Sequence, residues 1–571
     1  MTEVLAPVEA TGDGEAPGWR RVASAAPAYL PAAIVAIGGW SHRWVDEDAF
    51  INFRVLDQIF AGHGPVFNAG ERVEAATSPI WIAVLAVGRA LFGAFFGIEW
   101  IALVAGLIAA VGAFALAGRA AQLAHRDAGG AVVPVGLILI ASVAVVWDFA
   151  TSGLEMGMVW LWLSACWYVL VSVARADAVT GRRRATFAVI IGLAPLVRPE
   201  LGIMMVCFVV AWFVLARPRR TVVDLAAMFA LPVAYEIFRM GYYATIVPNT
   251  ALAKDAGGLH LSQGWNYATD FVTPYRLWLS ATLIVAVVGL RLCSQRDRRV
   301  GIATVAMLAA AVLGAVYIVV IGGDYMHGRL LLPAFFALGL PASVAIRDRA
   351  LSGPAVCTVA GIWALVTVLW FRPPLPPPTF GLGPPQVADW RAISGARIVP
   401  IDDALGLNGI KAHAMYERGV RGYFRVADKE PRPSRDPSAF VLTLGSIGVP
   451  AYHAGKDVWV IDIGGLAEPL AARTDPVPGR QAGHRKEIDY AWYDARFGVV
   501  TDDPAAIAAH RALNCEPVKG LLDAVDGPMS IGRFFSNIWH SVSYTRLRIP
   551  GHPEQAAAEF CPPDRRALDE R

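Results

Sequence analysis

The chain has 571 residues, of which 56% are hydrophobic and only 17% are charged, with a formal net charge of +3. This composition excludes an ordinary soluble protein and is typical of a polytopic α-helical membrane protein. The small positive balance does not indicate nucleic acid as a partner, because the basic residues cluster between long apolar runs. The amino end lacks the order of charge, short apolar run and cleavage site of a signal peptide, so we expect the first run to be retained.

About eleven apolar runs are predicted to span the bilayer, several of them shorter than the usual ~20 residues. Arg20 and Arg21 precede the first run, which predicts a cytoplasmic amino terminus, with residues 1–21 as a disordered tail. The basic loops between later runs then predict an extracytoplasmic C-terminal part. The expected spans are 23–40, 98–117, 131–147, 157–174, 185–197, 201–215, 222–243, 277–290, 302–321, 330–346 and 354–371. The short pair on either side of residues 198–200 predicts helices broken at depth around a cavity.

The apolar run 79–96 does not fit this alternation. If it also crossed the membrane, the basic residues Arg119, His125 and Arg126 would lie outside. We therefore interpret it as an interfacial or re-entrant helix, and a full span is the alternative.

Three consecutive acids, Asp46, Glu47 and Asp48, follow the first run almost at once. A carboxylate at the bilayer centre costs roughly 2.5–3.5 kcal/mol, so these residues are expected at an interface or in a wet cavity. From Asp46 onward the apolar spacing is helical, which predicts an amphipathic helix lying on the membrane. One interpretation is that the acids form an N-terminal cap that the helix dipole stabilises. The other is that one of them is a general base.

Other unusual polar residues gather on the outer side in this topology. Arginine, lysine and histidine suit a phosphate, and carboxylates suit proton transfer and sugar contacts. The candidate phosphate ligands are Arg198, Lys254, His327 and Arg329, and the candidate substrate contacts are Arg54, Glu74, Glu155, Glu200, Asn249 and Asp324. The alternatives are local: an ion pair between Arg198 and Glu200, a helix-face pair of Glu236 with Arg239, and a simple turn over 324–329.

Several familiar motifs are missing from the sequence. There is no Rossmann fingerprint, P-loop, HExxH or paired Cys/His site, so neither a nucleotide donor nor a zinc ion is indicated. No cofactor is required, although the oxygen ligands of Asp46 and Asp48 are of the type that a divalent cation takes.

The residues after 371 form a separate unit in the sequence. A proline-rich linker, 372–385, separates a membrane domain, 22–371, from 386–571, which has ordinary globular composition. Alternating stretches at 439–443 and 458–463 predict strands, and hence an α/β or β-rich extracytoplasmic domain. Cys515 and Cys561 are the two cysteines of this region, which suggests one disulfide on an oxidising side of the membrane.

Six motifs, in this order, resemble the GT-C superfamily of polyprenyl-phosphate-dependent glycosyltransferases. They lie at 48–54, 62–74, 152–155, 198–200, 248–254 and 322–329. Within that superfamily the full-length layout, including residues 460–466, is most similar to the mycobacterial arabinofuranosyltransferases. The resemblance implies decaprenyl-phosphoryl arabinose as donor, the arabinan of arabinogalactan or lipoarabinomannan as acceptor, action at the outer face of the plasma membrane, and an outer domain that holds glycan.

The expected reaction is an inverting transfer in which Asp46 or Asp48 deprotonates the acceptor hydroxyl. The acidic motif of the family usually begins with two acids directly before the alanine, which correspond here to Glu47 and Asp48. The alternatives are a transferase of another sugar such as mannose or aminoarabinose, a lipid-linked sugar transporter, and a structural envelope protein. Transporters often show repeated halves, and the sequence has no internal repeat.

Overall fold

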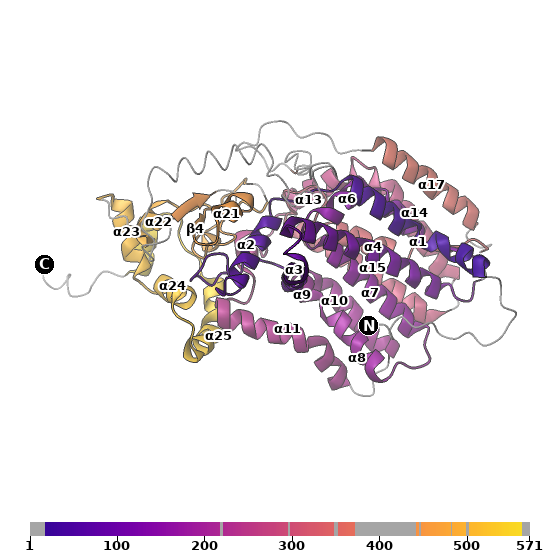
Figure 1. The fold of residues 1–571 in the computed structure, drawn as a ribbon, viewed down its shortest axis with the longest axis horizontal. Coiled ribbons are helices and arrows are strands. Elements are labelled where there is room, and N and C mark those ends of the chain that lie inside the picture. Colours follow the sequence, from indigo (N-terminus) through magenta and orange to yellow (C-terminus); the bar gives the residue numbers. More distant parts are fainter. Residues whose placement is uncertain are drawn as a thin grey trace.

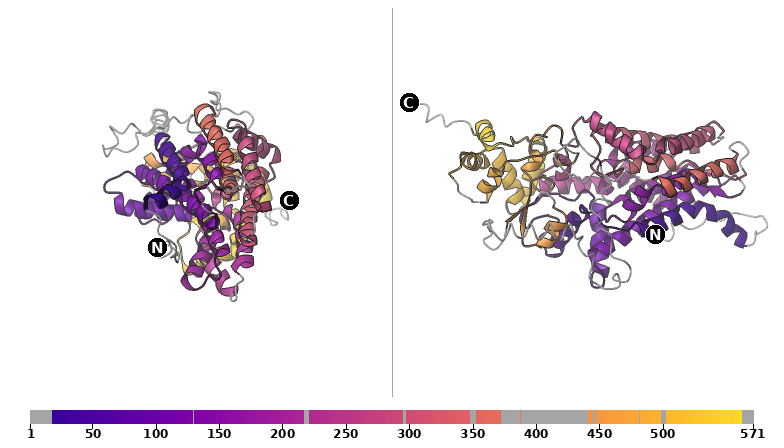
Figure 2. Two further views of the ribbon diagram at one scale, coloured as in Figure 1. Left: turned by 90° about the vertical axis from the view of Figure 1, so that its right-hand side faces the viewer. Right: turned by 90° about the horizontal axis from the view of Figure 1, so that it is seen from above.

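The computed structural model describes residues 18–128, 130–216, 221–294, 297–347, 352–371, 387, 441–444, 447–480, 482–497 and 502–561. The described chain is elongated, with long helices bundled at one end and a smaller part, residues 441–561, at the other (Figures 1 and 2). We call these the membrane part and the C-terminal part. The predicted linker 372–385 and most of the predicted tail 1–21 lie outside the described residues.

The membrane part is almost entirely helical. Its helices are α1 (Gly18–Ser41), α2 (Ala49–Phe60), α3 (Pro79–Phe92), α4 (Ile98–Ala124), α5 (Val135–Ala141), α6 (Ala144–Thr151), α7 (Met156–Ala174), α8 (Gly181–Gly192), α9 (Ala194–Val197), α10 (Leu201–Ala216), α11 (Thr221–Tyr243), α12 (Asn249–Ala253), α13 (Leu261–Val272), α14 (Leu277–Ser294), α15 (Arg298–Val320), α16 (Leu332–Gly339) and α17 (Gly353–Trp370). Among the described helices, six are long and apolar enough to cross a membrane: α4, α7, α11, α14, α15 and α17. The protein is therefore a multi-pass membrane protein, and the total of eleven spans stays a prediction.

Two of the expected spans, 131–147 and 330–346, are not continuous helices. The first is divided into a short strand, β1 (Val132–Val133), and the helices α5 and α6; the second consists of α16 and the strand β2 (Val344–Ala345), which pairs antiparallel with β1. Pro134 and Pro341 stand at these breaks, where proline removes a backbone donor. The apolar runs alone did not reveal this, because hydrophobicity is the same on both sides of each break.

Small residues let the long helices approach closely. A Cβ atom on Gly157 of α7 would lie 2.4 Å from the carbonyl oxygen of Gly106 in α4, and one on Gly192 of α8 would lie 1.8 Å from that of Met228 in α11. Because lipid is as apolar as a side chain, membrane helices associate mainly through such van der Waals packing.

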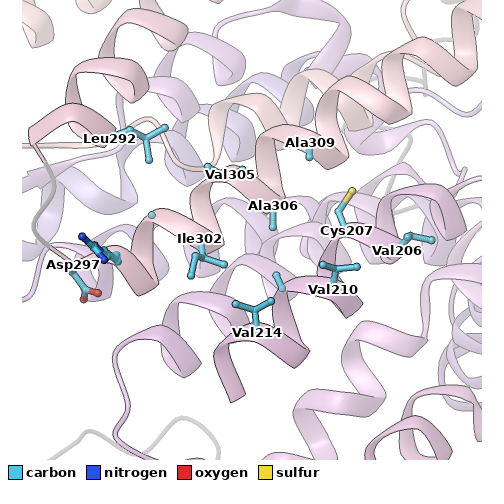
Figure 3. Close-up of a pocket in the computed structure, with 13 residues that line it drawn as sticks. Val206, Cys207, Val210, Val214, Leu292, Asp297, Ile302, Val305, Ala306 and Ala309 are labelled. Carbon is cyan, nitrogen blue, oxygen red and sulfur yellow. The ribbon is translucent and has the colours of Figure 1, made fainter. Parts of the chain in front are cut away.

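An apolar groove of about 590 Å³ runs between α10 and α15. Valine and isoleucine side chains of both helices line it, and Asp297 marks one end (Figure 3). The same two helices border the candidate site described below. Tyr317 and Ile318 of α15 line its cavity, and α10 begins directly after Glu200.

The acid-led helix α2 differs from the amphipathic surface helix that the sequence predicts. Nearly all of its side chains are buried, and Phe50 and Phe53 pack edge-on against Tyr452 of the C-terminal part. The helix is thus held between the two parts of the molecule. By contrast, α3 exposes apolar side chains such as Leu91 and Phe92, and its 14 residues fit the interfacial interpretation better than a full span.

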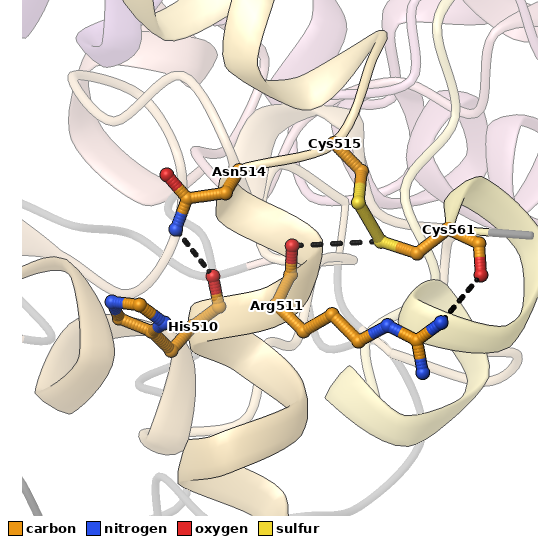
Figure 4. Close-up of a disulfide and its surroundings, with 5 residues drawn as sticks. All are labelled: His510, Arg511, Asn514, Cys515 and Cys561. Carbon is orange, nitrogen blue, oxygen red and sulfur yellow. Dashed lines mark hydrogen bonds between the residues drawn. A yellow bond between two sulfur atoms is a disulfide. The ribbon is translucent and has the colours of Figure 1, made fainter. Parts of the chain in front are cut away.

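The C-terminal part is a mixed α/β structure in the residues that are described. Its elements are β3 (Val441–Leu444), α21 (Val449–Ala454), β4 (Trp459–Asp462), the 3₁₀ helix η2 (Ala471–Arg473), α22 (Ala491–Arg496), α23 (Pro504–Leu513), α24 (Val518–Asp526), α25 (Ile531–Arg546) and α26 (Pro553–Phe560). The strands β3 and β4 are parallel, with Val441 opposite Trp459. Cys515, just after α23, and Cys561, at the end of α26, form a disulfide (Figure 4).

Two buried arginines join the C-terminal part to the membrane part. Arg54 of α2 donates to the carbonyl oxygens of Ala451 at 2.5 Å, Gly455 at 2.8 Å and Val458 at 2.6 Å. The second is Arg496 of α22, whose guanidinium pairs with carboxylates from both parts. They belong to Glu71 at 2.6 Å, Glu468 at 2.8 Å and Asp526 at 3.1 Å.

Replacing Arg496 tests this junction. The substitution Arg496→Leu leaves three buried carboxylates without their cation, and breaking such a pair costs about 3–5 kcal/mol. We expect a clearly lower Tm for the purified protein in detergent micelles. The matched control is Arg480→Leu, whose pair with Glu487 is exposed and worth about 0–1 kcal/mol. Equal Tm values for the two variants would contradict the role assigned to Arg496.

Candidate functional site

The three adjacent acids between α1 and α2 have three different environments. Asp46 is fully buried: its Oδ1 accepts the backbone N–H of Asp48 at 2.8 Å, and its Oδ2 has no hydrogen-bond partner among the described residues. The Oε1 of Glu47 accepts the backbone N–H of Gly448, in the C-terminal part, at 2.5 Å. The side chain of Asp48 retains 13% exposure. The side chain of Asp48 makes no capping hydrogen bond to α2, whereas Asp46 accepts the N–H of Asp48 at the start of this helix, so an acidic cap remains the alternative.

Asp48 is held as an anion by its neighbours. Arg329 donates to its Oδ2 at 3.2 Å, and the Tyr325 hydroxyl donates to its Oδ1 at 3.2 Å. Burial favours the neutral acid, but the positive charges of Lys254 and Arg329 outweigh it and leave the pKa of Asp48 below its ordinary value. For Asp46, burial and then the negative charge of Asp48 raise the pKa well above its ordinary value. The pair therefore places a carboxyl group with a raised pKa beside one with a lowered pKa.

Arg329 links loops from three places in the chain. Its guanidinium lies 3.7 Å from the Asp324 carboxylate and 3.8 Å from that of Glu155, in addition to Asp48. Glu155, after α6, also pairs with Arg198, which in turn pairs with Glu200 before α10. Alternating charges thus continue from the acidic loop to the break between α9 and α10.

Glycine allows the Asp324 loop to turn at this point. Gly322 and Gly323 follow α15 with φ angles of +91° and +70°, a conformation that other residues rarely adopt. A Cβ atom on Gly323 would also lie 2.3 Å from the ring of Tyr267. The turn brings Asp324, Tyr325 and then Arg329 back over the end of α15.

A cavity of about 130 Å³ opens beside these loops. Among its lining residues are the charged side chains Arg198, Glu200, Lys254, Asp324 and Arg329. Tyr317, Ile318 and Ile321 at the end of α15 form part of its apolar wall. Lys254 has no ion-pair partner within 4 Å among the residues that the structure describes, so it is the cation most available to an anionic ligand.

Four other residues expected at the site lie elsewhere. Arg54, Glu74, Asn249 and His327 are not among the residues that line the cavity. The acids Asp46, Glu47 and Asp48 and the carboxylate of Glu155 do not line it either, but Asp48 and Glu155 contact Arg329, which does. Arg54 joins the two parts of the molecule, as described above, and Asn249 donates to the carbonyl oxygens of Gly465 at 2.7 Å and Glu468 at 3.2 Å. These two arrangements are structural contacts between parts of the chain.

The other two make local pairs. Glu74 accepts hydrogen bonds from Arg239 at 2.6 Å and from the Tyr235 hydroxyl at 2.7 Å, so it ties the loop before α3 to α11. The Nδ1 of His327 lies 2.6 Å from Asp270 of α13. Both pairs support the loops of the site from outside the cavity.

Two residues beside Asp48 were not singled out from the sequence. Tyr325 lies within the motif at 322–329, and this position was the sign in the sequence that it could belong to the site. His484 of the C-terminal part packs edge-to-face against Tyr325, with 4.9 Å between ring centroids. No local pattern marks His484, because only the fold brings residue 484 to this loop. Its neighbour Gly483 lines the cavity, and Arg485 donates to the Lys254 carbonyl oxygen at 3.2 Å.

The acidic pair does not fit a divalent cation. One oxygen of Asp46 and both oxygens of Asp48 accept hydrogen bonds from the protein, and the cation beside Asp48 is the guanidinium of Arg329. Within the described residues, no group of three or more His, Cys, Asp and Glu side chains is arranged as a metal site. We derive no step through a metal ion.

Comparison with known proteins identifies the family. The AftB family C-terminal domain model matches residues 421–559. The terminal β-(1→2)-arabinofuranosyltransferase of Mycobacterium tuberculosis is 31% identical over 92% of this chain and 96% of its own length. The protein of the same name from Corynebacterium glutamicum is 29% identical over 98% of this chain and 91% of its own length.

Among solved structures, the crystal structure of ArnT from Cupriavidus metallidurans bound to undecaprenyl phosphate is similar, with a TM-score of 0.46 and 15% identity. The match covers 78% of this chain and 86% of that one, and no property of ArnT is carried over from it. The relationship to the two curated proteins extends over nearly the whole of each chain. The resemblance seen in the motifs is thereby confirmed: this chain belongs to the family of terminal β-(1→2)-arabinofuranosyltransferases.

Proposed function

We propose that the protein transfers arabinofuranose from decaprenyl-phosphoryl arabinose to the non-reducing ends of cell-wall arabinan at the outer face of the plasma membrane. Family membership supports the sugar and the reaction. The observation that carries the mechanism is the Asp48 carboxyl group, with its lowered pKa, hydrogen-bonded to Arg329, which lines the cavity together with Arg198 and Lys254. A base beside a cationic cavity is what transfer from a phosphate donor to a hydroxyl requires.

Asp48 accepts the proton of the acceptor hydroxyl. That oxygen forms the new bond to the anomeric carbon, while the bond from this carbon to the phosphate oxygen breaks. Tyr325 and Arg329 hold the carboxylate in place, and Asp46 accepts the backbone N–H of Asp48. A single displacement of this kind inverts the anomeric carbon, as the sequence analysis expects.

The cations of the cavity stabilise the leaving phosphate. Arg198 and Arg329 are fixed by Glu155, whereas Lys254 is left for the ligand. Negative charge on the bound phosphate also offsets the cations that lower the pKa of Asp48. Because a carboxylate with a higher pKa is a stronger base, donor binding prepares Asp48 for proton transfer.

The apolar groove between α10 and α15 suits the lipid tail of the donor. The helix α10 begins directly after Glu200, and α15 ends at the cavity, so the groove follows the same helix pair away from the phosphate cations. The C-terminal part supplies Gly483 to the cavity wall and faces the acceptor side. With a cytoplasmic amino terminus, the cavity opens to the extracytoplasmic side, where the glycan acceptor lies.

The substitution Asp48→Asn removes the base without changing the size of the side chain. We expect kcat to fall about 10²–10⁴-fold with synthetic donor and acceptor in proteoliposomes. The matched control is Asp46→Asn, which introduces an uncharged amide where the pKa of the carboxyl group is raised, so this variant should retain most of the activity. If Asp46→Asn is the inactive variant and Asp48→Asn is active, the assignment of the base is wrong.

The anomeric configurations of donor and product test the inverting course. A β-linked product formed by one displacement requires an α-configured donor phosphate. NMR of both molecules checks this, and the same configuration in donor and product would exclude a single displacement.

The substitution Lys254→Met tests the phosphate cradle. Loss of the available cation should raise the donor KM, with a smaller effect on the acceptor KM, because only the donor carries phosphate. Lys456→Met is a suitable control, since Lys456 pairs with Asp457 on the surface. An unchanged donor KM in Lys254→Met would contradict this role.

The pH dependence should differ between the free and the donor-bound enzyme. Asp48 must be a carboxylate, so activity is lost as pH falls through its pKa, which lies below the ordinary value of an aspartate in the free protein. We therefore expect the acid limb in kcat/KM for the donor to lie below the pH at which an ordinary aspartate titrates. The limb in kcat should lie at higher pH, because bound phosphate raises the pKa of Asp48. If the acid limbs of kcat/KM and of kcat lie at the same pH, donor binding does not raise the pKa of Asp48.

A further inference from the structure

The helix α25 of the C-terminal part exposes a row of large apolar side chains. Ile531 is 80% exposed, Phe535 65%, Trp539 83% and Val542 41%. The spacing of four, four and three residues places them on one side of the helix. Isolated apolar residues are common on protein surfaces, but a contiguous row with two aromatic rings indicates an interaction site.

The other sides of α25 are different. Asn537, Ser541 and Thr545 are buried, and Asn537 donates to the carbonyl oxygen of Gly241 at 2.9 Å. The residues Ser536 and His540 form an exposed polar side. The helix therefore has one side against the protein, one polar side and one apolar side without a partner among the described residues.

The position of α25 relative to the bilayer follows from α11. This helix is one of the candidate spans, and it exposes Leu231, Val233 and Ile237 along its length. Gly241, which α25 contacts, is four residues beyond Ile237, or about 6 Å along the helix axis. Figure 1 shows α25 at the end of α11 that adjoins the C-terminal part. The helix thus lies about one turn beyond the last exposed apolar residue of the span, which is the level of the lipid headgroups.

We propose that Ile531, Phe535, Trp539 and Val542 are embedded in the headgroup boundary of the leaflet nearest the C-terminal part. Amphipathic helices of this kind bury their apolar side about 5–10 Å into that boundary. Tryptophan is favoured there because its ring has an apolar body and a polar N–H group. Arg546 and Arg548 are exposed at the end of the helix, where they can pair with lipid phosphates.

This contact anchors the C-terminal part to the bilayer independently of α2 and Arg54. It limits the movement of that part over the membrane and so keeps the segment with Gly483 and Arg485 over the cavity. The inference does not depend on which sugar is transferred.

Spin labels on the full-length protein test the anchor. In a background with Cys166, Cys207, Cys293 and Cys357 replaced by alanine and the disulfide kept, Phe535→Cys and Trp539→Cys are labelled separately. The protein is placed in nanodiscs of phosphatidylcholine and phosphatidylglycerol. The matched control is His540→Cys, on the polar side of the same helix. All three positions are exposed, so the substitutions leave the packing intact.

The readout is collision with oxygen, which is enriched in lipid, compared with a water-soluble nickel chelate. At residues 535 and 539 we expect the spin label to collide more often with oxygen than with the chelate. At residue 540 we expect more collisions with the chelate than with oxygen. Chelate accessibility at 535 and 539 equal to that at 540 would overturn the proposal. Protection of 535 and 539 from both reagents would also overturn it, because that result indicates a protein partner such as a second copy of the chain.

Discussion

The guanidinium of Arg329 is the group on which the organisation of the site depends. A buried charge is costly unless carboxylates surround it, and Asp48, Glu155 and Asp324 do so from separate loops. Because each loop begins or ends a different helix, the same contacts set the ends of α1, α6, α15 and α2 relative to one another. Lys254 and this guanidinium lower the pKa of Asp48 against the effect of burial, and the cavity lies where the loops converge.

The C-terminal part belongs to the site rather than serving only as an appended domain. Its segment around Gly483 lines the cavity, His484 packs on Tyr325, and Arg485 holds the carbonyl oxygen of Lys254. Its attachment uses buried polar groups, notably Arg54 and Arg496, each with several partners. Such junctions favour one geometry, because partial separation would leave charges buried and unpaired. The bilayer contact of α25 adds a third constraint from a different direction.

Several residues show how far the sequence could lead. The acids, Arg198, Lys254, Asp324 and Arg329 could be predicted, because charged residues at the ends of apolar runs are costly and therefore conspicuous. Arg54 and Asn249 were conspicuous for the same reason, yet they bind backbone carbonyls of the C-terminal part. Polarity at a membrane edge signals that a residue has a polar partner, but not whether that partner is a ligand or another segment of the chain. His484 carried no signal, since its proximity to Tyr325 arises between residues far apart in sequence.

By itself the sequence determined the class of the protein: a multi-pass membrane enzyme of a recognisable family, with its candidate charges and its two cysteines in the C-terminal region. Only the tertiary structure decided which carboxyl group has the raised and which the lowered pKa, which helices are broken, and which of the predicted residues line the cavity. The physical reason is that hydrophobicity and charge type are properties of each residue, whereas burial and the distance to an opposite charge are properties of the packed chain. Asp46 and Asp48 are chemically identical side chains, and the fold alone makes them different acids.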